Sequence, residues 1–429
     1  MTPAARIAAA IEILDEIAAT RGPADGVIKA WGRNHRFAGS KDRRGIAEHV
    51  YVALRARARS QWRMGSDKGR ALILGALAGQ PLDDINTLFA SGGHGPEPLS
   101  DDERNRLVAP LPTPPDWVAA GLPEWIAPLF QARYGADWIA EGQAATLERA
   151  PVDLRVNALR GPVENALNLL AHEDVKPDRT PFSAWGLRLP AGFATDVHTL
   201  KAFTTGWVEV QDEASQIAAF LARAKPGALV IDYCAGGGGK TLALAASLAG
   251  RGRLVASDVD QKRLDAMDER LKRAAAKVEV RRLQPNGEGM EEFENLADLV
   301  FVDAPCSGSG TWRRHPEAAW RLNLETVERL AALQQTILAR AAKLVKPGGR
   351  ILYATCSMLE QENEQVAAAF AATHPDFHPI PIAEAPTANL HEPGRARLAA
   401  LAAGGHTLQL TPHRTGTDGF FAATFERTV

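Results

Sequence analysis

Short apolar segments alternate with helical segments from Ala228 to Thr355, and this alternation constrains the fold more than any other feature of the sequence. Strands joined by helices form βαβ units, whose strands lie parallel in a sheet covered on both faces. Ligands of such sheets bind beyond the carboxyl ends of the strands. We therefore expect an α/β, Rossmann-like sheet with its chemistry at that edge. The predicted elements are ALVIDY, GKTLALAASLA, RLVASD, QKRLDAMDERLKRAAA, VEVRR, DLVFVD, a long helix near 325–345, and RILYAT.

The 429 residues are too many for one core, so further domains are expected before this sheet. Residues 1–90 carry apolar side chains at helical spacing, which predicts an all-helical N-terminal domain. Residues 91–120 concentrate Gly, Pro and acidic residues and are predicted to be a linker. Residues 121–205 are predicted to form two helices followed by a small α+β unit, and 206–429 the sheet domain.

Composition excludes several classes of protein. With 45% hydrophobic and 23% charged residues the chain is of ordinary globular type, and no apolar run is long enough to span a membrane. We expect a cytoplasmic protein with no membrane partner. Three cysteines without close pairs predict neither a disulfide framework nor a zinc site, so no metal is expected. The net charge is -2, but residues 1–75 hold 14 Lys or Arg against 7 Asp or Glu, which indicates either an RNA-facing arm or a solvated helix surface.

The turn DYCAGGGGK follows the first strand of the sheet domain and precedes a helix. Four glycines there let the backbone approach a ligand at the helix N-terminus, whereas the alternative is merely a flexible turn. A P-loop NTPase is a second interpretation, but its motif needs a glycine where Cys234 stands. Asp258 ends the next strand, at a spacing that suits the ribose of a cofactor; a helix N-cap would look identical.

Two further strands run into cysteines at the same expected edge. DLVFVDAPCSGSG carries Cys306, and RILYATCS carries Cys356. A lone cysteine is more often a small buried hydrophobe than a catalyst. Both of these are flanked by turn formers or small polar residues, which favours covalent chemistry over inert packing.

These motifs resemble the Sun/Fmu/RsmB-type RNA cytosine-5 methyltransferases. DYCAGGGGK is similar to their DLCAAPGGK loop, DAPCSGSGTWRRHPEAAW to their DAPCSGxGxxxRxP segment, and YATCSMLEQENE to their TCSxxxxENE segment. Weaker matches are LRVNALR, VQDEASQ and TDGFFAATF. The resemblance covers roughly residues 150–429, and the N-terminal helices more loosely resemble a NusB-like RNA-binding domain.

The resemblance implies a class I methyltransferase fold that uses S-adenosylmethionine. The residues it implies for cofactor binding are Cys234, Ala235, Gly236, Gly237, Gly238, Gly239, Lys240, Asp258 and Asp303. Gly236 and Gly237 depart from the Ala-Pro of the family. The loop after the third strand lacks the usual acid near the adenine and offers only Gln284 and Asn286, so no residue is assigned there.

Carbon-5 of cytosine is a poor nucleophile, so its methylation requires a thiol to add first to carbon-6. The family resemblance assigns that attack to Cys356 and product release to Cys306; DNA cytosine methyltransferases attack with the Pro-Cys thiol instead, and the sequence itself does not distinguish the two. Asp303 is expected to hydrogen-bond the base, or else to cap its turn. Lys240 is expected to lower the pKa of the attacking thiol.

The expected partner is RNA, most simply ribosomal RNA, bound by a monomer. Transfer RNA is an alternative substrate, and a P-loop-like NTPase or a non-catalytic RNA-binding protein are the other functions considered. The Pro-Cys segment continues into Arg313, Arg314 and His315, which are predicted either to contact phosphates or to form an exposed charged loop. A stacked base cannot reach such a site, so an unpaired or flipped-out cytidine is expected.

Overall fold

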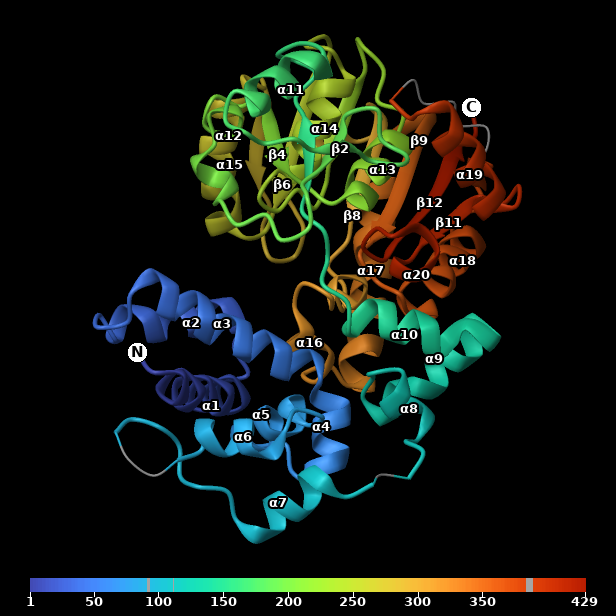
Figure 1. Cartoon of the computed structure of the whole chain (residues 1–429). Helices are drawn as coiled ribbons and strands as arrows, with labels where there is room; N and C mark the ends of the chain where they lie inside the picture. The colour runs from blue at the N-terminus through green and yellow to red at the C-terminus, as the bar shows by residue number, and fades with distance from the viewer. Residues whose placement is uncertain (91–92, 111, 383–388) are drawn as a thin grey trace. The chain divides into compact units, whose positions relative to one another are not determined.

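The computed structural model describes residues 1–90, 93–110, 112–382 and 389–429 (Figure 1). The chain forms two compact units. Residues Met1–Arg149 and Thr311–Asn323 make up the first, which we call the helical unit. Residues Ala150–Gly310 and Leu324–Val429 make up the second, which we call the sheet unit. Each is described by itself.

The helical unit is built on amphipathic helices that bury one face each. In the first helix, α1, Ile7, Ile13 and Ile17 are buried at helical spacing, and Thr2 caps the N-terminus by accepting a hydrogen bond from the amide of Ala5. The predicted N-terminal helices are therefore present. The elements of this unit are α1 (Pro3–Thr20), α2 (Ala24–Asn34), α3 (Ser40–Arg55), α4 (Arg57–Met64), α5 (Gly69–Leu77), α6 (Leu82–Leu88), α7 (Asp101–Val108), α8 (Asp116–Ala119), η1 (Glu124–Ile126), α9 (Ala127–Tyr134), η2 (Gly135–Asp137), α10 (Trp138–Thr146) and α16 (Pro316–Ala319).

The predicted linker contains a helix, α7. Ser100 and Glu103 form a capping box at its start, in which the Ser100 hydroxyl accepts from the Glu103 amide and the Glu103 carboxylate accepts from the Ser100 amide. Glu103 also pairs with Arg70 of α5 at 2.7 Å. The Gly- and Pro-rich flanks hid this local start signal, so the composition of the segment was a poor guide.

Residues 311–323 belong to the helical unit although they lie far along the chain (Figure 1). Trp312 is fully buried, and its ring stacks on Phe130 with centroids 6.2 Å apart. The Glu317 carboxylate accepts a hydrogen bond from the amide of Ala24 at 3.1 Å. The sequence had instead predicted one continuous domain over 206–429, because nothing local marks a segment whose partners lie 200 to 300 residues away.

The sheet unit begins with a small antiparallel sheet of strand order β2-β3-β1-β4. Its strands pair antiparallel throughout. The region 121–205, predicted as one part of the chain, is thus divided: its two helices lie in the helical unit and its α+β part lies here. The elements of the α+β part are β1 (Asp153–Val156), α11 (Val163–Ala171), β2 (Asp178–Arg179), β3 (Gly186–Arg188), η3 (Val197–Thr199), α12 (Lys201–Thr204) and β4 (Val208–Val210).

The larger sheet has the order β10-β12-β9-β8-β5-β6-β7, with β11 paired to β12. From β7 to β9 the strands are parallel, and β12 runs antiparallel to β9. The α/β expectation is confirmed. The elements are α13 (Glu213–Leu221), β5 (Leu229–Asp232), α14 (Gly239–Ser247), β6 (Arg253–Asp258), α15 (Gln261–Ala274), β7 (Glu279–Arg282), η4 (Glu291–Phe293), β8 (Ala297–Asp303), η5 (Ser309–Thr311), α17 (Leu324–Ala342), β9 (Val345–Thr355), η6 (Glu360–Glu362), α18 (Glu364–Thr373), β10 (Phe377–Pro379), α19 (Glu392–Ala402), β11 (Thr407–Leu410), α20 (Pro412–Thr415) and β12 (Phe420–Arg427).

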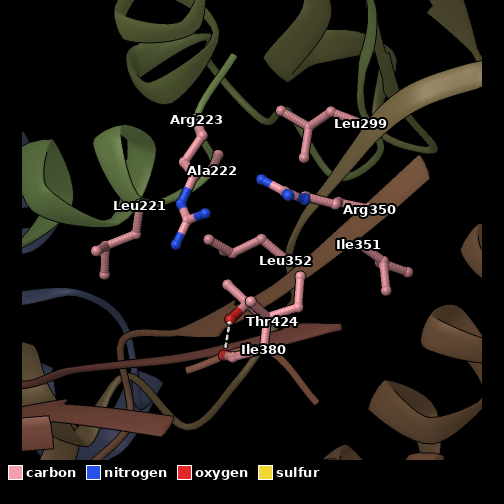
Figure 2. A pocket seen from close by; sticks show the side chains of 9 residues that line it. All are labelled: Leu221, Ala222, Arg223, Leu299, Arg350, Ile351, Leu352, Ile380 and Thr424. Atoms are coloured by element: carbon pink, nitrogen blue, oxygen red, sulfur yellow. Dashed lines mark hydrogen bonds between the residues drawn. The ribbon is translucent and has the colours of Figure 1, made fainter. Parts of the chain in front are cut away.

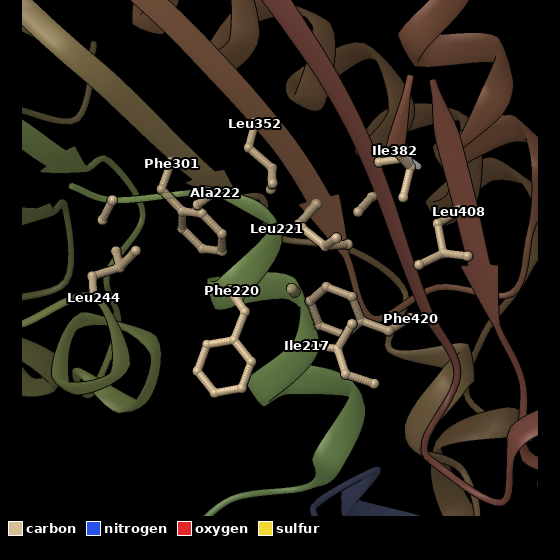
Figure 3. Close-up of a cluster of buried hydrophobic side chains, with 14 of the residues drawn as sticks. Ile217, Phe220, Leu221, Ala222, Leu244, Phe301, Leu352, Ile382, Leu408 and Phe420 are labelled. Atoms are coloured by element: carbon tan, nitrogen blue, oxygen red, sulfur yellow. The ribbon is translucent and has the colours of Figure 1, made fainter. Parts of the chain in front are cut away.

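Successive strand residues point to opposite faces of the sheet. Since consecutive residues of these strands are apolar, both faces are apolar. On one face Phe301 and Leu352 pack against Ile217 and Phe220 of α13 (Figure 3). On the other, the neighbouring residues of the same strands pack against α17 and α18. A sheet buried on both faces leaves only its edges and strand ends for polar chemistry.

Candidate active site

Four parallel strands deliver polar side chains to one edge of the larger sheet. The carboxyl ends of β5, β6 and β8 are Asp232, Asp258 and Asp303, and Cys356 directly follows β9. Parallel strands that are neighbours in the sheet end at the same edge, so the site assembles from segments spread over 125 residues of chain. The side chains that were predicted to lie at this edge are therefore found there.

The glycine loop between β5 and α14 has the backbone that its sequence requires. Gly236 and Gly238 adopt positive φ angles of 53° and 81°, and a Cβ on Gly238 would lie 2.5 Å from the Met267 side chain. The amide of Gly236 donates to Asp258 Oδ2 at 2.9 Å. Asp260, and not Asp258, is the N-cap of α15, so the capping explanation for Asp258 falls away.

Two arginines outside the predicted site hold the carbonyls of this loop. Arg155 of β1 donates to the Gly239 carbonyl at 2.7 Å, and Arg270 of α15 donates to the Gly237 carbonyl at 2.5 Å. Glu209 of β4 accepts from Arg270 Nε at 3.1 Å. Sequence reasoning missed these residues; the weak match LRVNALR contains Arg155, whereas Arg270 and Glu209 lie outside every matched motif. They brace a loop in which Gly237 has replaced the proline of the family.

Asp232 is a second carboxylate beside the loop. It is fully buried and accepts from the Thr241 hydroxyl at 2.6 Å, while its Oδ1 has no hydrogen-bond partner among the described residues. Burial raises the pKa of Asp232 to about 7. A buried carboxylate oxygen without a partner among the described residues fits a ligand with a positively charged group.

Asp258 retains acceptor capacity for a ligand as well. Its two oxygens take one amide each, from Gly236 at 2.9 Å and Asp260 at 2.8 Å, and an ionised carboxylate can accept about four hydrogen bonds. The loop, Asp232 and Asp258 together therefore fit S-adenosylmethionine, which carries an ammonium group and a ribose.

The two strand-end cysteines lie together. Cys306 Sγ is 3.3 Å from Cys356 Sγ, and both side chains are partly buried. The hydrogen bond with Cys356 and burial raise the pKa of the Cys306 thiol well above its ordinary value. The Cys306 thiol is therefore harder to deprotonate than an ordinary cysteine.

Glu362 bridges the turns that carry both cysteines. This fully buried carboxylate accepts from the amide and hydroxyl of Ser307, at 2.8 and 2.5 Å, and from the hydroxyl of Ser357 at 2.6 Å. Each serine is the neighbour of a cysteine. Gln334 of α17 completes the arrangement by donating to Glu362 Oε1 and to the carbonyl of Pro305. The sequence showed Glu362 only as part of a motif.

A glycine contact closes the other side of the Pro-Cys turn. The Gly310 amide donates to the Cys356 carbonyl at 2.9 Å, and its carbonyl accepts from the Gly419 amide at 2.8 Å. A Cβ on Gly310 would lie 2.0 Å from the Gly419 carbonyl oxygen, so only glycine permits this approach. The weak match TDGFFAATF thus lies against the site.

Lys240 forms an ion pair with Asp303 at 2.6 Å. Burial alone would lower the pKa of Lys240, but the charges of Asp303 and Cys356 raise it above its ordinary value. Lys240 is thus an ammonium within electrostatic range of Cys356. Its engagement with Asp303 also leaves the P-loop interpretation without a lysine for phosphates.

At three other residues the structure differs from what the sequence suggested. Burial raises the pKa of Cys234 well above its ordinary value, and its side chain packs against the apolar core, so only its backbone belongs to the loop. Arg313 is only 2% exposed, so it does not offer its charge to a phosphate as predicted. Asn286 holds its own turn by accepting from the Glu288 amide.

A small hollow elsewhere in the sheet unit has no relation to these groups. It is lined by the amino-terminal parts of β8 and β9, including Leu299 and Arg350, together with Arg223 after α13 (Figure 2). Within the residues the structure describes, no three His, Cys, Asp or Glu side chains are grouped as metal ligands. None of the helices in that part of the chain is long and apolar enough to cross a bilayer.

The strand order, the glycine loop and the acid that ends β6 define a class I methyltransferase fold with an S-adenosylmethionine site. The sequence profile of the 16S rRNA methyltransferase RsmB/F family matches residues 208–426, and that of the RsmF/B-like ferredoxin-like domain matches residues 122–196. The chain belongs to the RsmB/F methyltransferase family, whose cofactor is S-adenosylmethionine.

Named relatives and solved structures agree with this assignment. Ribosomal RNA small subunit methyltransferase B of Pectobacterium carotovorum is 33% identical over 304 residues, 70% of this chain, and that of Vibrio vulnificus 33% over 307 residues. The matched region spans 65% of the length of these relatives. The crystal structure of PH0851 covers 100% of this chain and 99% of its own, with 25% identity and a TM-score of 0.76. A methyltransferase homologue from Pyrococcus horikoshii covers 73% of this chain and 97% of its own, with 25% identity and a TM-score of 0.59.

Proposed function

We propose that this protein methylates carbon-5 of a cytidine in RNA, with ribosomal RNA as the substrate. The observation that carries the proposal is the pair of thiols 3.3 Å apart at the cofactor edge of the sheet. Relatives named as ribosomal RNA small subunit methyltransferases support the choice of RNA. S-adenosylmethionine supplies an electrophilic methyl group.

In this mechanism the Cys356 sulfur bonds to carbon-6, and the electron pair of the carbon-5 to carbon-6 double bond shifts toward carbon-4, with the developing negative charge on ring nitrogen 3. Carbon-5 thereby becomes an enamine-type nucleophile that takes the methyl group. Lys240, held by Asp303 at 2.6 Å, lies near Cys356 as a cation and stabilises its thiolate. Asp303 is the acid at this edge that orients the base.

Product release falls to Cys306. Its pKa is raised first by the hydrogen bond with Cys356, and that cause vanishes once the Cys356 sulfur is bonded to carbon-6. Cys306 then loses its proton to solvent and removes the proton from carbon-5 as a base, and the Cys356 sulfur leaves carbon-6 as the double bond re-forms.

The experiment is bisulfite sequencing of total RNA from cells with and without the gene. Loss of one protected cytidine in 16S ribosomal RNA, restored by the wild-type gene but not by a Cys356→Ala gene, is the expected result. Loss of a protected cytidine in transfer RNA would instead identify transfer RNA as the substrate. An unchanged pattern in every RNA, with purified protein that still binds S-adenosylmethionine, would leave the site without this activity.

A further inference from the structure

The turn between α2 and α3 displays an aromatic ring to solvent. Phe37 is 70% exposed, in a helical unit whose other large apolar side chains are mostly buried. A single exposed apolar side chain is ordinary on a protein surface, but an exposed ring that is also held in one position presents a fixed aromatic face to a ligand. The attachment here is not loose.

Two further rings hold Phe37 in place. Trp31, which is 5% exposed, stacks on His35 with centroids 4.1 Å apart and an interplanar angle of 14°. Phe37 meets the His35 ring edge-on at 5.7 Å and the Trp31 ring at 6.5 Å. Ala38 is buried beside it, and its carbonyl accepts from Arg43 Nε at 2.9 Å. The ring therefore stands on a packed base.

The turn and the ends of α2 and α3 that flank it are strongly basic. Residues 33–44 hold five Lys or Arg and one acid, Asp42. The charge of Asp42 is already offset, because its carboxylate binds the amino group of Met1 at 3.2 Å and Arg6 at 3.0 Å. The basic side chains of residues 33–44 are exposed: Arg33, Arg36, Lys41, Arg43 and Arg44. A fixed ring amid cations matches an unpaired nucleotide, whose base has a π-face and whose phosphates are anionic.

We propose that this surface, residues 33–44 with Phe37 at its tip, binds an unpaired segment of RNA by stacking one base on Phe37 and contacting the adjacent phosphates with its basic side chains. The inference rests on the proposed function, in that the substrate is RNA, and it names the part of the helical unit that receives that RNA. Paired bases cannot stack on a side chain in this way, so the surface selects single strands.

The test measures binding of a 12-nucleotide unstructured RNA and of the same sequence in a duplex, by fluorescence anisotropy at several salt concentrations. Phe37→Ala should weaken single-strand binding about 10-fold without changing the salt dependence, and Phe37→Trp should restore it. Arg36→Gln should reduce the slope of log K against log salt by about 0.7 for single-stranded RNA. Val108→Ala, a change at a side chain 62% exposed in the same unit, is the matched control and should change neither.

Equal binding by Phe37→Ala and wild type, or equal losses for single strand and duplex, would overturn the proposal. The proposal would also be overturned if Phe37→Ala bound RNA normally but failed to methylate an assembled ribosomal particle. The surface would then bind a protein of that particle and not RNA. If wild type methylates no RNA at all, the proposed function fails while the binding comparison still stands.

Discussion

Cys306 Sγ lies 3.3 Å from Cys356 Sγ although 50 residues separate them in the chain. The proximity follows from the sheet, because β8 and β9 are parallel neighbours whose carboxyl ends meet. It is then fixed by Glu362, which binds the serine next to each cysteine. Two thiols this close can act in sequence on the same ring.

The first prediction separates the thiols. Cys356→Ala removes the attacking sulfur and should give neither methylated RNA nor a covalent adduct. Cys306→Ala permits attack and methyl transfer but stalls release, and should accumulate a protein–RNA species that survives denaturation on a gel. An adduct from Cys356→Ala but not from Cys306→Ala would reverse the assignment, whereas no adduct from either would leave both as packing residues.

The second prediction concerns Glu362. Glu362→Gln keeps the volume but places a donor among groups that already donate, so the two cysteine turns should separate. Because a misplacement of about 1 Å can cost on the order of 100-fold in rate, kcat should fall by about that factor while S-adenosylmethionine affinity stays within twofold. Glu360→Gln, at an exposed side chain in the same short helix, is the control. Wild-type kcat in Glu362→Gln would show that the bridge is dispensable.

The third prediction concerns the cofactor loop. Asp258→Ala removes the acceptor for the Gly236 amide and a proposed ribose ligand, so calorimetry should show loss of S-adenosylmethionine binding. Arg270→Gln should weaken it less, because Arg155 still holds the neighbouring carbonyl. Asp265→Ala, an exposed acid on α15, serves as the control. Binding of ATP-Mg²⁺ without any response to S-adenosylmethionine would restore the P-loop interpretation.

The fourth prediction is a pH dependence of stability. Burial raises the pKa of Asp232 from 3.8 to about 7, so between these values the folded protein holds a proton that the unfolded chain has released. This stability is complete below about pH 3.8 and is lost as pH rises toward 7, at up to about 1.4 kcal/mol per pH unit. In urea unfolding at a series of pH values, Asp232→Asn should abolish this pH dependence of the free energy of unfolding. At pH 8 the variant should be more stable than the wild type. Parallel curves for the two proteins would contradict the assignment.

The fifth prediction concerns Trp312. Its fully buried ring stacks on Phe130, so Trp312→Ala should destabilise the helical unit by about 3–5 kcal/mol in urea unfolding. Deletion of residues 1–75 would be a poor test of RNA binding by this arm, because it would also remove the Ala24 amide that donates to Glu317. Charge-removing substitutions such as Arg36→Gln test the basic arm more cleanly. An unchanged unfolding midpoint for Trp312→Ala would contradict this.

Local patterns predicted the larger sheet well, because each strand and helix carries its own periodicity and parallel strands share an edge. Cys306, Cys356 and Asp258 could be placed at that edge for the same reason. The supports of the site could not, since Arg155 reaches Gly239 from 84 residues away and Glu362 acts through serines on two other segments. The start signal of α7 was present in Ser100 and Glu103, but the surrounding glycines and prolines outweighed it.

The packing of Trp312 also determines when, during translation, the helical unit can complete its fold. When Arg149 has left the ribosome, the sequence of α1 to α10 has been made but not the segment that packs against Phe130, which ends at Asn323. At about 5–20 residues per second, the wait is on the order of ten seconds or more. During that interval the Phe130 site is open to solvent and to chaperones, and the first unit to be translated closes only after the glycine loop and the first cysteine turn have been made.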